Sequence, residues 1–367
     1  MRFTGGHRPR SRFVPLIAAL AVCVPLWLWF AVHFPDTAWD FTGFYIAGNI
    51  PLHQVHDQQV FQNFGNSELA PLGVRYYPPY VRPSVFAVPL HLIMSLPYWT
   101  AYWLWAAAQL LAFLSALWLL QTRLHLPVGT NPIWAIFFPA WFGIITGQDA
   151  LGVLLIVVAG IVFIEKGRDG IGGALLALTL YKFNLSLLIP VALMFRGKWH
   201  ALASYAVVGA GLAAASALVE APSKYLELLR TIGSYTVGFR PETMLGLRGL
   251  AHFLHLPWLY FLLAPLTIAA AAWKLRRSQD LPESIGIALT ASILCAWHGT
   301  WYDGALLALP AALLFHCART TGRVVAAIVL ALPFWNAFPQ IATLAVVGLF
   351  AAQLALKAGS SQAHFST

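Results

Sequence analysis

The chain has 367 residues, of which 59% are hydrophobic and only 10% are charged, and its mean hydropathy is +0.72. Because roughly 25% of the residues in an ordinary soluble domain are charged, this composition excludes a soluble enzyme, a disordered regulator and a fibrous protein. The formal net charge is +9. The apolar runs are continuous rather than alternating, which favours membrane helices over a β-barrel.

The first predicted element is a membrane span. Four arginines within residues 1–12 precede an apolar run over residues 13–32. This run has about 20 residues, the length needed to cross a bilayer. No small-residue cleavage site of a signal peptide follows it. We therefore expect a retained span with a cytoplasmic N-terminus.

A long polar stretch over residues 33–83 comes next, rich in aromatic residues and proline. Ordered loops of this length are usually functional. Residues 84–96 are apolar, and Pro97 separates them from the next run. They form either a surface or half-inserted helix or a further crossing. We expect residues 33–97 together to make a long loop on the outer face.

The remaining apolar runs predict further spans. They are 98–121, 132–146, 149–165, 170–182, 184–195, 200–219, 257–273, 283–297, 303–317, 323–337 and 339–356. The expected fold is therefore an all-α polytopic membrane protein of about twelve transmembrane helices. Residues 1–357 form a single integral membrane domain with two long outer loops, 33–97 and 220–256, and residues 358–367 form a disordered tail.

The distribution of charge predicts the orientation. Of the 22 Lys and Arg residues, 15 fall on one side of this topology together with four acids; the other side receives seven basic and nine acidic residues. Because short cytoplasmic loops carry an excess of Lys and Arg, the basic side is cytoplasmic and includes both termini. We expect a multi-pass protein of the cell (plasma or inner) membrane. The positive charge reflects orientation, and no nucleic-acid partner is expected.

Neither the cysteines nor the histidines predict a metal site. Cys23, Cys295 and Cys317 lie in apolar runs and form no CxxC pair. Two histidine pairs, at 53 and 56 and at 252 and 255, have i, i+3 spacing but lack carboxylate partners at a suitable distance in the sequence. We expect no metal and no cofactor.

Three short polar turns fall on the expected outer face, at residues 146–149, 181–184 and 298–303. Ionisable groups at membrane depth are costly and are functional hypotheses by default. The alternative is that these charges and aromatic residues only mark helix ends at the membrane interface. The clustering of three such turns on one face, beside two long loops, favours a site.

Five segments in a fixed order carry a resemblance to a known family. They are Asp40–Gly48 just after the first span, Tyr77–Pro79, Gly147–Gln148, Lys182, and Tyr302–Asp303. In this order and spacing the chain resembles glycosyltransferase family 87, membrane enzymes of the C-type glycosyltransferase superfold. The resemblance covers most of residues 13–320. In the second long loop, where the family often has an Asn-x-Ser segment, only Leu247–Gly249 matches its pattern.

The resemblance implies an inverting hexosyltransferase, with mannose as the sugar by family analogy. Such enzymes take a sugar from a polyprenyl-phosphate carrier in the outer leaflet and pass it to a glycan or lipid acceptor. It implies Asp40 as the general base that deprotonates the acceptor hydroxyl. Fixed cations stabilise a leaving phosphate; the candidates are Lys182, Arg75, Arg82, Arg240 and Arg248. The candidate substrate-binding residues are Tyr45, Tyr77, Gln148, Asp149, His298, Tyr302 and Asp303.

Several alternatives stay open at this point. Asp40, Asp149 and Asp303 have the positions of helix-capping residues, and Lys182 is either a phosphate ligand or an interface charge. For the whole chain, the alternatives are a transporter or flippase of a lipid-linked glycan and a non-catalytic scaffold. Transporters show internal repeats and broken helices near the midplane. No repeat is present and the charges lie near the outer boundary, so the enzyme is favoured. No nucleotide-binding glycine loop or DxD pair occurs, which disfavours a nucleotide-sugar donor.

Overall fold

The computed structural model describes residues 13–33, 39–233, 241–318, 320–331 and 339–356. Within these ranges the regular elements are helical and no strand occurs. The α-helices are α1 (Val14–His33), α2 (Trp39–Ala47), α3 (Gln58–Phe64), α4 (Leu90–Met94), α5 (Tyr98–Thr122), α6 (Phe138–Thr146), α7 (Ala150–Glu165), α8 (Asp169–Leu178), α9 (Phe183–Ser186), α10 (Ile189–Phe195), α11 (Trp199–Val219), α12 (Pro222–Gly233), α13 (Leu247–Phe253), α14 (Trp258–Arg277), α15 (Leu281–Cys295), α16 (Ala308–Cys317), α17 (Thr320–Ala331) and α18 (Pro339–Ala355). Shorter helical turns are η3 (Leu52–Gln54), η4 (Gly65–Leu69), η5 (Ala70–Leu72), η6 (Ser84–Ala87), η7 (Pro132–Ile136), η8 (Thr179–Lys182), η9 (Pro241–Thr243) and η10 (Trp301–Leu307).

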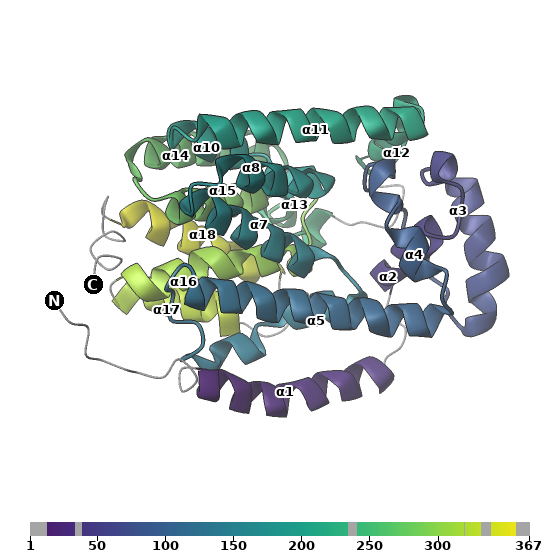
Figure 1. The fold of residues 1–367 in the computed structure, drawn as a ribbon, viewed down its shortest axis with the longest axis horizontal. Coiled ribbons are helices and arrows are strands. Elements are labelled where there is room, and N and C mark those ends of the chain that lie inside the picture. Colours follow the sequence, from purple (N-terminus) through teal and green to yellow (C-terminus); the bar gives the residue numbers. More distant parts are fainter. Residues whose placement is uncertain (1–12, 34–38, 234–240, 319, 332–338, 357–367) are drawn as a thin grey trace.

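The longer helices run side by side along the long axis of the molecule (Figure 1). Helix α8 packs against both α7 and α11, and α5 packs against α7. Helix α15 is buried along almost its whole length because α10, α14, α16 and α18 contact it. Continuous apolar runs suit such positions, since a helix that is hydrophobic all round is one buried in a core or in a membrane.

Two glycines let α8 lie close to both of its neighbours. A Cβ atom at Gly172 would lie 2.6 Å from the carbonyl oxygen of Gly160 on α7, and one at Gly173 would lie 2.0 Å from the carbonyl oxygen of Ala201 on α11. Small residues at helix interfaces permit this close packing in membrane proteins. The packing of α7 and α8 in turn fixes the two polar turns that adjoin these helices.

The region expected to be the first outer loop is a folded helical unit. Between residues 39 and 97 the chain forms α2, α3 and α4 with four shorter helical turns, gathered at one end of the molecule (right in Figure 1). A second hydrophobic core holds the unit together, with Phe41, Phe61 and Tyr102 among its fully buried side chains. The sequence did not predict the helices within residues 39–83, because dense aromatic packing orders a stretch that looks irregular by hydropathy alone.

The structure does not confirm the count of about twelve spans. Among the described residues, three helices are long and apolar enough to cross a membrane, α5, α11 and α14, or five spans if each of two bent helix pairs counts as one. Residues 132–146 meet α7 at 118°, and residues 169–186 meet α10 at 114°. Helix α6 has 9 residues and is about 14 Å long, so it cannot cross a hydrocarbon core of about 30 Å alone.

Several other boundaries expected from the sequence agree with the helices of the structure, and some fall outside the described residues. The ranges expected for spans 98–121, 200–219, 257–273, 283–297 and 339–356 each contain one helix with similar bounds. Residues 84–94 form a short helical segment of about 16 Å, too short to cross by itself. The expected tail over residues 358–367 lies outside the described residues.

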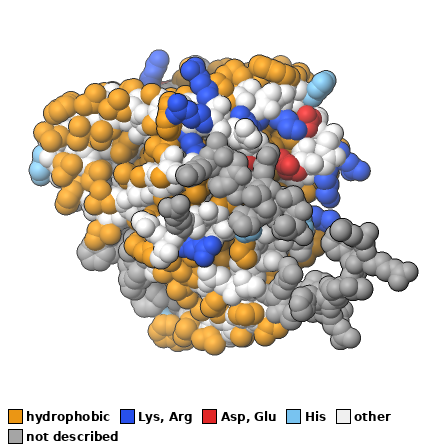
Figure 2. Space-filling view, turned by 90° about the vertical axis from the view of Figure 1, so that its left-hand side faces the viewer, with side chains coloured by type: hydrophobic (Ala, Val, Ile, Leu, Met, Phe, Trp, Pro, Cys, Tyr) orange, Lys and Arg blue, Asp and Glu red, His pale blue; other side chains and the backbone are white. Residues whose placement is uncertain are grey.

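One end of the molecule is rich in basic side chains. Figure 2 looks at the end opposite α2, α3 and α4 and shows Lys and Arg gathered there, with apolar side chains on the flanks. Lys and Arg follow or close several helices, at Arg123 after α5, at Lys166 after α7, and at Arg276 and Arg277 in the last turn of α14. Cations at helix C-termini complement the helix dipole.

Candidate active site

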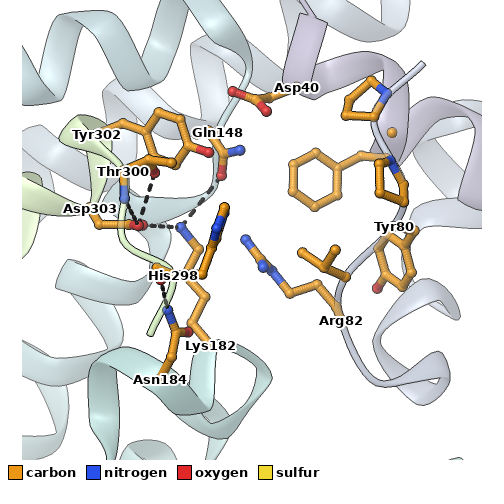
Figure 3. A pocket seen from close by; sticks show the side chains of 15 residues that line it. Asp40, Tyr80, Arg82, Gln148, Lys182, Asn184, His298, Thr300, Tyr302 and Asp303 are labelled. Carbon is orange, nitrogen blue, oxygen red and sulfur yellow. Dashed lines mark hydrogen bonds and ion pairs between the residues drawn. The ribbon is translucent and has the colours of Figure 1, made fainter. Parts of the chain in front are cut away.

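A polar pocket lies where the first helical unit meets the helices of the main bundle. Its empty volume is about 610 Å³. Figure 3 shows side chains converging on it from both sides. The lining residues are Asp40, Gly43, Phe44, Pro78, Pro79, Tyr80, Val81, Arg82, Gln148, Lys182, Asn184, His298, Thr300, Tyr302 and Asp303. All three polar turns singled out in the sequence contribute to this pocket, as does the segment after Tyr77.

Asp40 lies in the first turn of α2 and points into the pocket (Figure 3). Burial raises the pKa of its carboxyl group to about 7, although a hydrogen bond from Gln148 and the nearby charges of Lys182 and Arg82 oppose the shift. Among the described residues, its Oδ2 atom has no hydrogen-bond partner. One carboxylate oxygen is therefore left to accept a hydrogen bond, and the carboxyl group has a proton affinity suited to exchange near neutral pH.

Lys182 is a buried cation held between two carboxylates. Its Nζ atom lies 2.8 Å from Asp149 Oδ1 and 2.8 Å from Asp303 Oδ1, and its side chain is 2% exposed. The same amine donates to Gln148 Oε1 at 3.4 Å. Because that oxygen faces Lys182, the amide nitrogen of Gln148 is the group that donates to Asp40. Lys182 thus orients the side chain that contacts the candidate base.

Arg82 enters the pocket from the opposite side and also pairs with Asp149. Its Nε and Nη2 atoms lie 3.3 and 3.4 Å from the two oxygens of that carboxylate. The carboxylate of Asp149 therefore contacts both Arg82 and Lys182. The pocket wall therefore holds two cations balanced by two carboxylates, with Asp40 as a further acid.

The sequence left helix capping open as the role of Asp149 and Asp303, and the structure gives a different answer for each. Asp303 does cap: its Oδ2 atom accepts from the backbone N–H and the hydroxyl of Thr300, both at 2.9 Å, in a capping box at the start of η10. Asp149 occupies the N-cap position of α7, but its side chain makes no capping hydrogen bond. Its carboxylate bridges Lys182 and Arg82 instead, since two buried cations compete for it more strongly than a backbone amide.

Two further residues of the 298–303 turn line the pocket. The ring of Tyr302 lies 5.3 Å from Lys182 Nζ. The carbonyl oxygen of His298 accepts a hydrogen bond of 2.6 Å from Asn184 Nδ2, which ties this turn to α9. Burial lowers the pKa of His298 to about 4, so its imidazole is neutral at pH 7 and makes this part of the pocket wall polar but uncharged.

Some predicted site residues lie away from the pocket. Arg75 is exposed. The hydroxyl of Tyr45 donates to the carbonyl oxygen of Leu96, and that of Tyr77 donates to the carbonyl oxygen of Val74. Both tyrosines pack with the second hydrophobic core, where they support the segments that carry Asp40 and Arg82.

Arg248, in the second outer region (residues 220–256), does not line the pocket. The guanidinium of Arg248 stacks on the Trp297 ring, 3.6 Å from its centroid, and donates to the carbonyl oxygen of the same residue. Arg240 lies outside the described residues.

Among the lining residues with polar side chains, sequence reasoning missed three, Tyr80, Asn184 and Thr300. Asn184 and Thr300 belong to turns that the sequence singled out, but only their charged neighbours were chosen. The spacing of Thr300 and Asp303 is a capping signal of the S/T-x-x-D type, which would have found Thr300. No group of three or more His, Cys, Asp or Glu side chains suited to a metal ion occurs in the part of the chain that the structure describes.

A bundle of apolar helices, with a polar pocket that holds a carboxylic acid beside paired cations, defines an integral membrane protein with a site for a polar substrate. The chain belongs to glycosyltransferase family 87, whose family model matches residues 76–310. It is a membrane glycosyltransferase. The matched region includes Arg82, Gln148, Lys182 and the 298–303 turn, and Asp40 precedes it. Searches of curated proteins and of solved structures found no match.

Proposed function

We propose that the protein is an inverting hexosyltransferase that moves a sugar, mannose by family analogy, from a polyprenyl-phosphate carrier to a glycan or lipid acceptor at the outer face of the membrane. Asp40 is the general base. The observation that carries the proposal is the Oδ2 atom of Asp40, which has no hydrogen-bond partner among the described residues and belongs to the same pocket as Arg82 and Lys182. A base and phosphate-binding cations are the two parts that this reaction requires.

The reaction is a single displacement. Asp40 accepts the proton of the acceptor hydroxyl as its oxygen forms a bond to the anomeric carbon of the donor sugar. The bond between that carbon and the phosphate oxygen breaks, and the electron pair leaves with the carrier phosphate. One attack from the face opposite the leaving group inverts the anomeric centre. Arg82 and Lys182 stabilise the charge that develops on the phosphate.

A second cavity supports a donor with an apolar carrier. It has an empty volume of about 820 Å³ and shares Phe44, Tyr80 and Arg82 with the polar pocket. Its other walls are largely apolar and include Phe86, Leu90, Ile93, Trp105 and Ile156. A phosphate bound at Arg82 would have its sugar on the polar side and its hydrocarbon chain on the apolar side. A soluble nucleotide sugar would gain nothing from this second cavity.

The test is a transfer assay in membranes that offers polyprenyl-phosphate-mannose, -glucose and -arabinose in turn. Asp40→Asn keeps the size of the side chain but cannot accept a proton, so we expect transfer to fall by about 100-fold or more while the protein still folds. Asp57→Asn is the matched control, because Asp57 is an aspartate of the same unit that caps α3 outside the pocket. Near-normal turnover in Asp40→Asn would remove Asp40 as the base.

The two bent helix pairs favour one other function, a transporter or flippase of a lipid-linked glycan, since broken helices often line transport sites. The same assay separates the two. A transporter moves the intact lipid-linked glycan between leaflets of a vesicle and forms no new glycosidic bond, whereas the enzyme releases polyprenyl phosphate.

A further inference from the structure

His56 and Glu220 form a buried pair outside the pocket that the proposed reaction does not use. They are 5% and 6% exposed, and they come from distant parts of the chain, the segment after η3 and the C-terminal end of α11. The Nδ1 atom of His56 contacts Glu220 Oε2, and the backbone N–H of His56 donates to the other carboxylate oxygen at 3.4 Å. A buried ionisable pair is costly to maintain.

The second ring nitrogen of His56 connects this pair to the pocket. Its Nε2 atom lies 2.8 Å from the backbone carbonyl oxygen of Arg82. A carbonyl oxygen only accepts, so Nε2 carries the hydrogen whichever partner holds the proton between His56 and Glu220. Because Glu220 takes the opposite nitrogen, the ring cannot rotate without losing both contacts.

Neighbouring contacts hold the same segment against the end of α11 and α12. The ring of Tyr225 lies 4.8 Å from that of His56, and its hydroxyl donates to the carbonyl oxygen of Val81 at 3.5 Å. Ser84 Oγ donates to the carbonyl oxygen of Ser216 at 3.2 Å. The backbone from Val81 to Ser84 is therefore tied to the α11–α12 corner, with the bond from His56 at its centre. The guanidinium of Arg82 extends from this segment into the pocket (Figure 3).

We propose that His56, oriented by Glu220, is a positioning residue that fixes the backbone of Arg82, so that the guanidinium reaches the phosphate of the sugar donor. The inference rests on the proposed role of Arg82. Through His56 and Arg82, the corner between α11 and α12, at the start of the second outer region (residues 220–256), influences donor binding without contacting the donor.

Two substitutions at His56 separate the two contacts. In His56→Gln the amide nitrogen takes the place of Nε2 and still donates to the carbonyl oxygen of Arg82. In His56→Asn it takes the place of Nδ1, so the contact to Glu220 stays and the one to Arg82 is lost. We expect His56→Asn to raise the donor KM about tenfold with little change in kcat, and His56→Gln to stay near the wild-type value. His53→Asn is the control, because His53 is exposed and three residues away.

A double-mutant cycle and a binding measurement complete the test. In an Arg82→Ala background, His56→Asn should have no further effect on the donor KM. Protection against thermal unfolding by a short-chain polyprenyl phosphate should weaken in His56→Asn and persist in His56→Gln. Additive effects in the cycle, or equal protection of the two His56 variants by the polyprenyl phosphate, would overturn the positioning role of His56. Neither result would overturn the proposed donor. Wild-type protein that gains no protection would overturn the proposed donor, and the role of Arg82 with it.

Discussion

At the scale of single residues, the environment of Asp40 matters more than its chemical type. The chain has several aspartates near helix starts, but Asp149 and Asp303 are already paired with buried cations. Within the part of the chain that the structure describes, Asp40 keeps an oxygen without a hydrogen-bond partner, and burial raises its pKa to about 7. Aspartates in ion pairs make poor proton acceptors, because taking up a proton would leave the partner cation without its counter-charge.

The raised pKa predicts a pH profile. Only the ionised carboxylate accepts a proton, so kcat/KM should rise with pH through about 7 and level off above it. Gln148→Leu removes a hydrogen bond that lowers this pKa, so the acidic limb should move to higher pH. The measurement is kcat/KM against pH, with Asp57→Asn as a control whose limb stays in place. A wild-type limb at about pH 4, the ordinary value of an aspartate, would contradict the assignment.

Lys182 is part of a buried ion-pair network and is also a proposed phosphate ligand, and variants can separate the two roles. Lys182→Met leaves Asp303 without its buried cation, so we expect the free energy of unfolding to fall by about 3 kcal/mol and donor use to be lost. Lys182→Met/Asp303→Asn removes one charge of each sign and should regain much of that stability but no donor use. Thermal unfolding and the donor KM provide the two readouts. A double variant as unstable as the single one would show that the pair is not coupled.

At the scale of helices, one close approach helps to hold α2 in place. Gly147, after α6, has a φ of +78°, and a Cβ atom there would lie 2.3 Å from the Cβ of Phe41. Phe41 follows Asp40 on α2, and Gln148 follows Gly147. The contact therefore sets the distance between the candidate base and the amide that orients it.

Gly147→Ala tests this contact. The added methyl group should displace α2, lowering stability by about 1–3 kcal/mol and reducing kcat as Asp40 moves. Gly73→Ala is a matched control, because Gly73 has a φ of +84° with open space around it. The Gly73→Ala variant has the same left-handed backbone strain, but its added methyl group meets no neighbouring atom. Equal losses of activity in the two variants would mean that strain alone, and not the position of α2, is responsible.

At the scale of the whole molecule, the polar pocket and the basic end lie at opposite ends of the same helices. Helix α5 begins at Tyr98, in the core of the first helical unit, and is followed by Arg123. Helix α7 begins beside Asp149 and is followed by Lys166. If the basic end is cytoplasmic, the pocket opens toward the outer face, where the proposed donor lies.

Reporter fusions test this orientation. Fusions at Gly65 and Lys224 should behave as outer-face reporters, and fusions at both termini as cytoplasmic ones, because the excess of Lys and Arg sets the orientation. The measurement is paired reporter activity, with one enzyme active only inside the cell and one only outside. Cytoplasmic behaviour at Gly65 and Lys224 would overturn the outer-face site.

The sequence by itself determined the class of the protein and several of its longer helices. Long apolar runs separated by Gly, Pro and charged residues are local signals, and they located α5, α11, α14 and α15 within a few residues. The order of short motifs indicated the family, which the match over residues 76–310 confirmed. The three polar turns were also visible, because a charge in an apolar sequence stands out wherever it is placed.

Only the tertiary structure decided which of these charges meet. Arg82 and Asp149 are separated by 67 positions, and Lys182 and Asp303 by 121. No local pattern distinguishes the pocket residue Arg82 from the exposed Arg75 in the same segment. The sharp bends at 118° and 114° and the aromatic core of the first helical unit also depend on packing between distant residues. Burial and pairing then set the proton affinity of each carboxylate, and both arise only when the chain has folded.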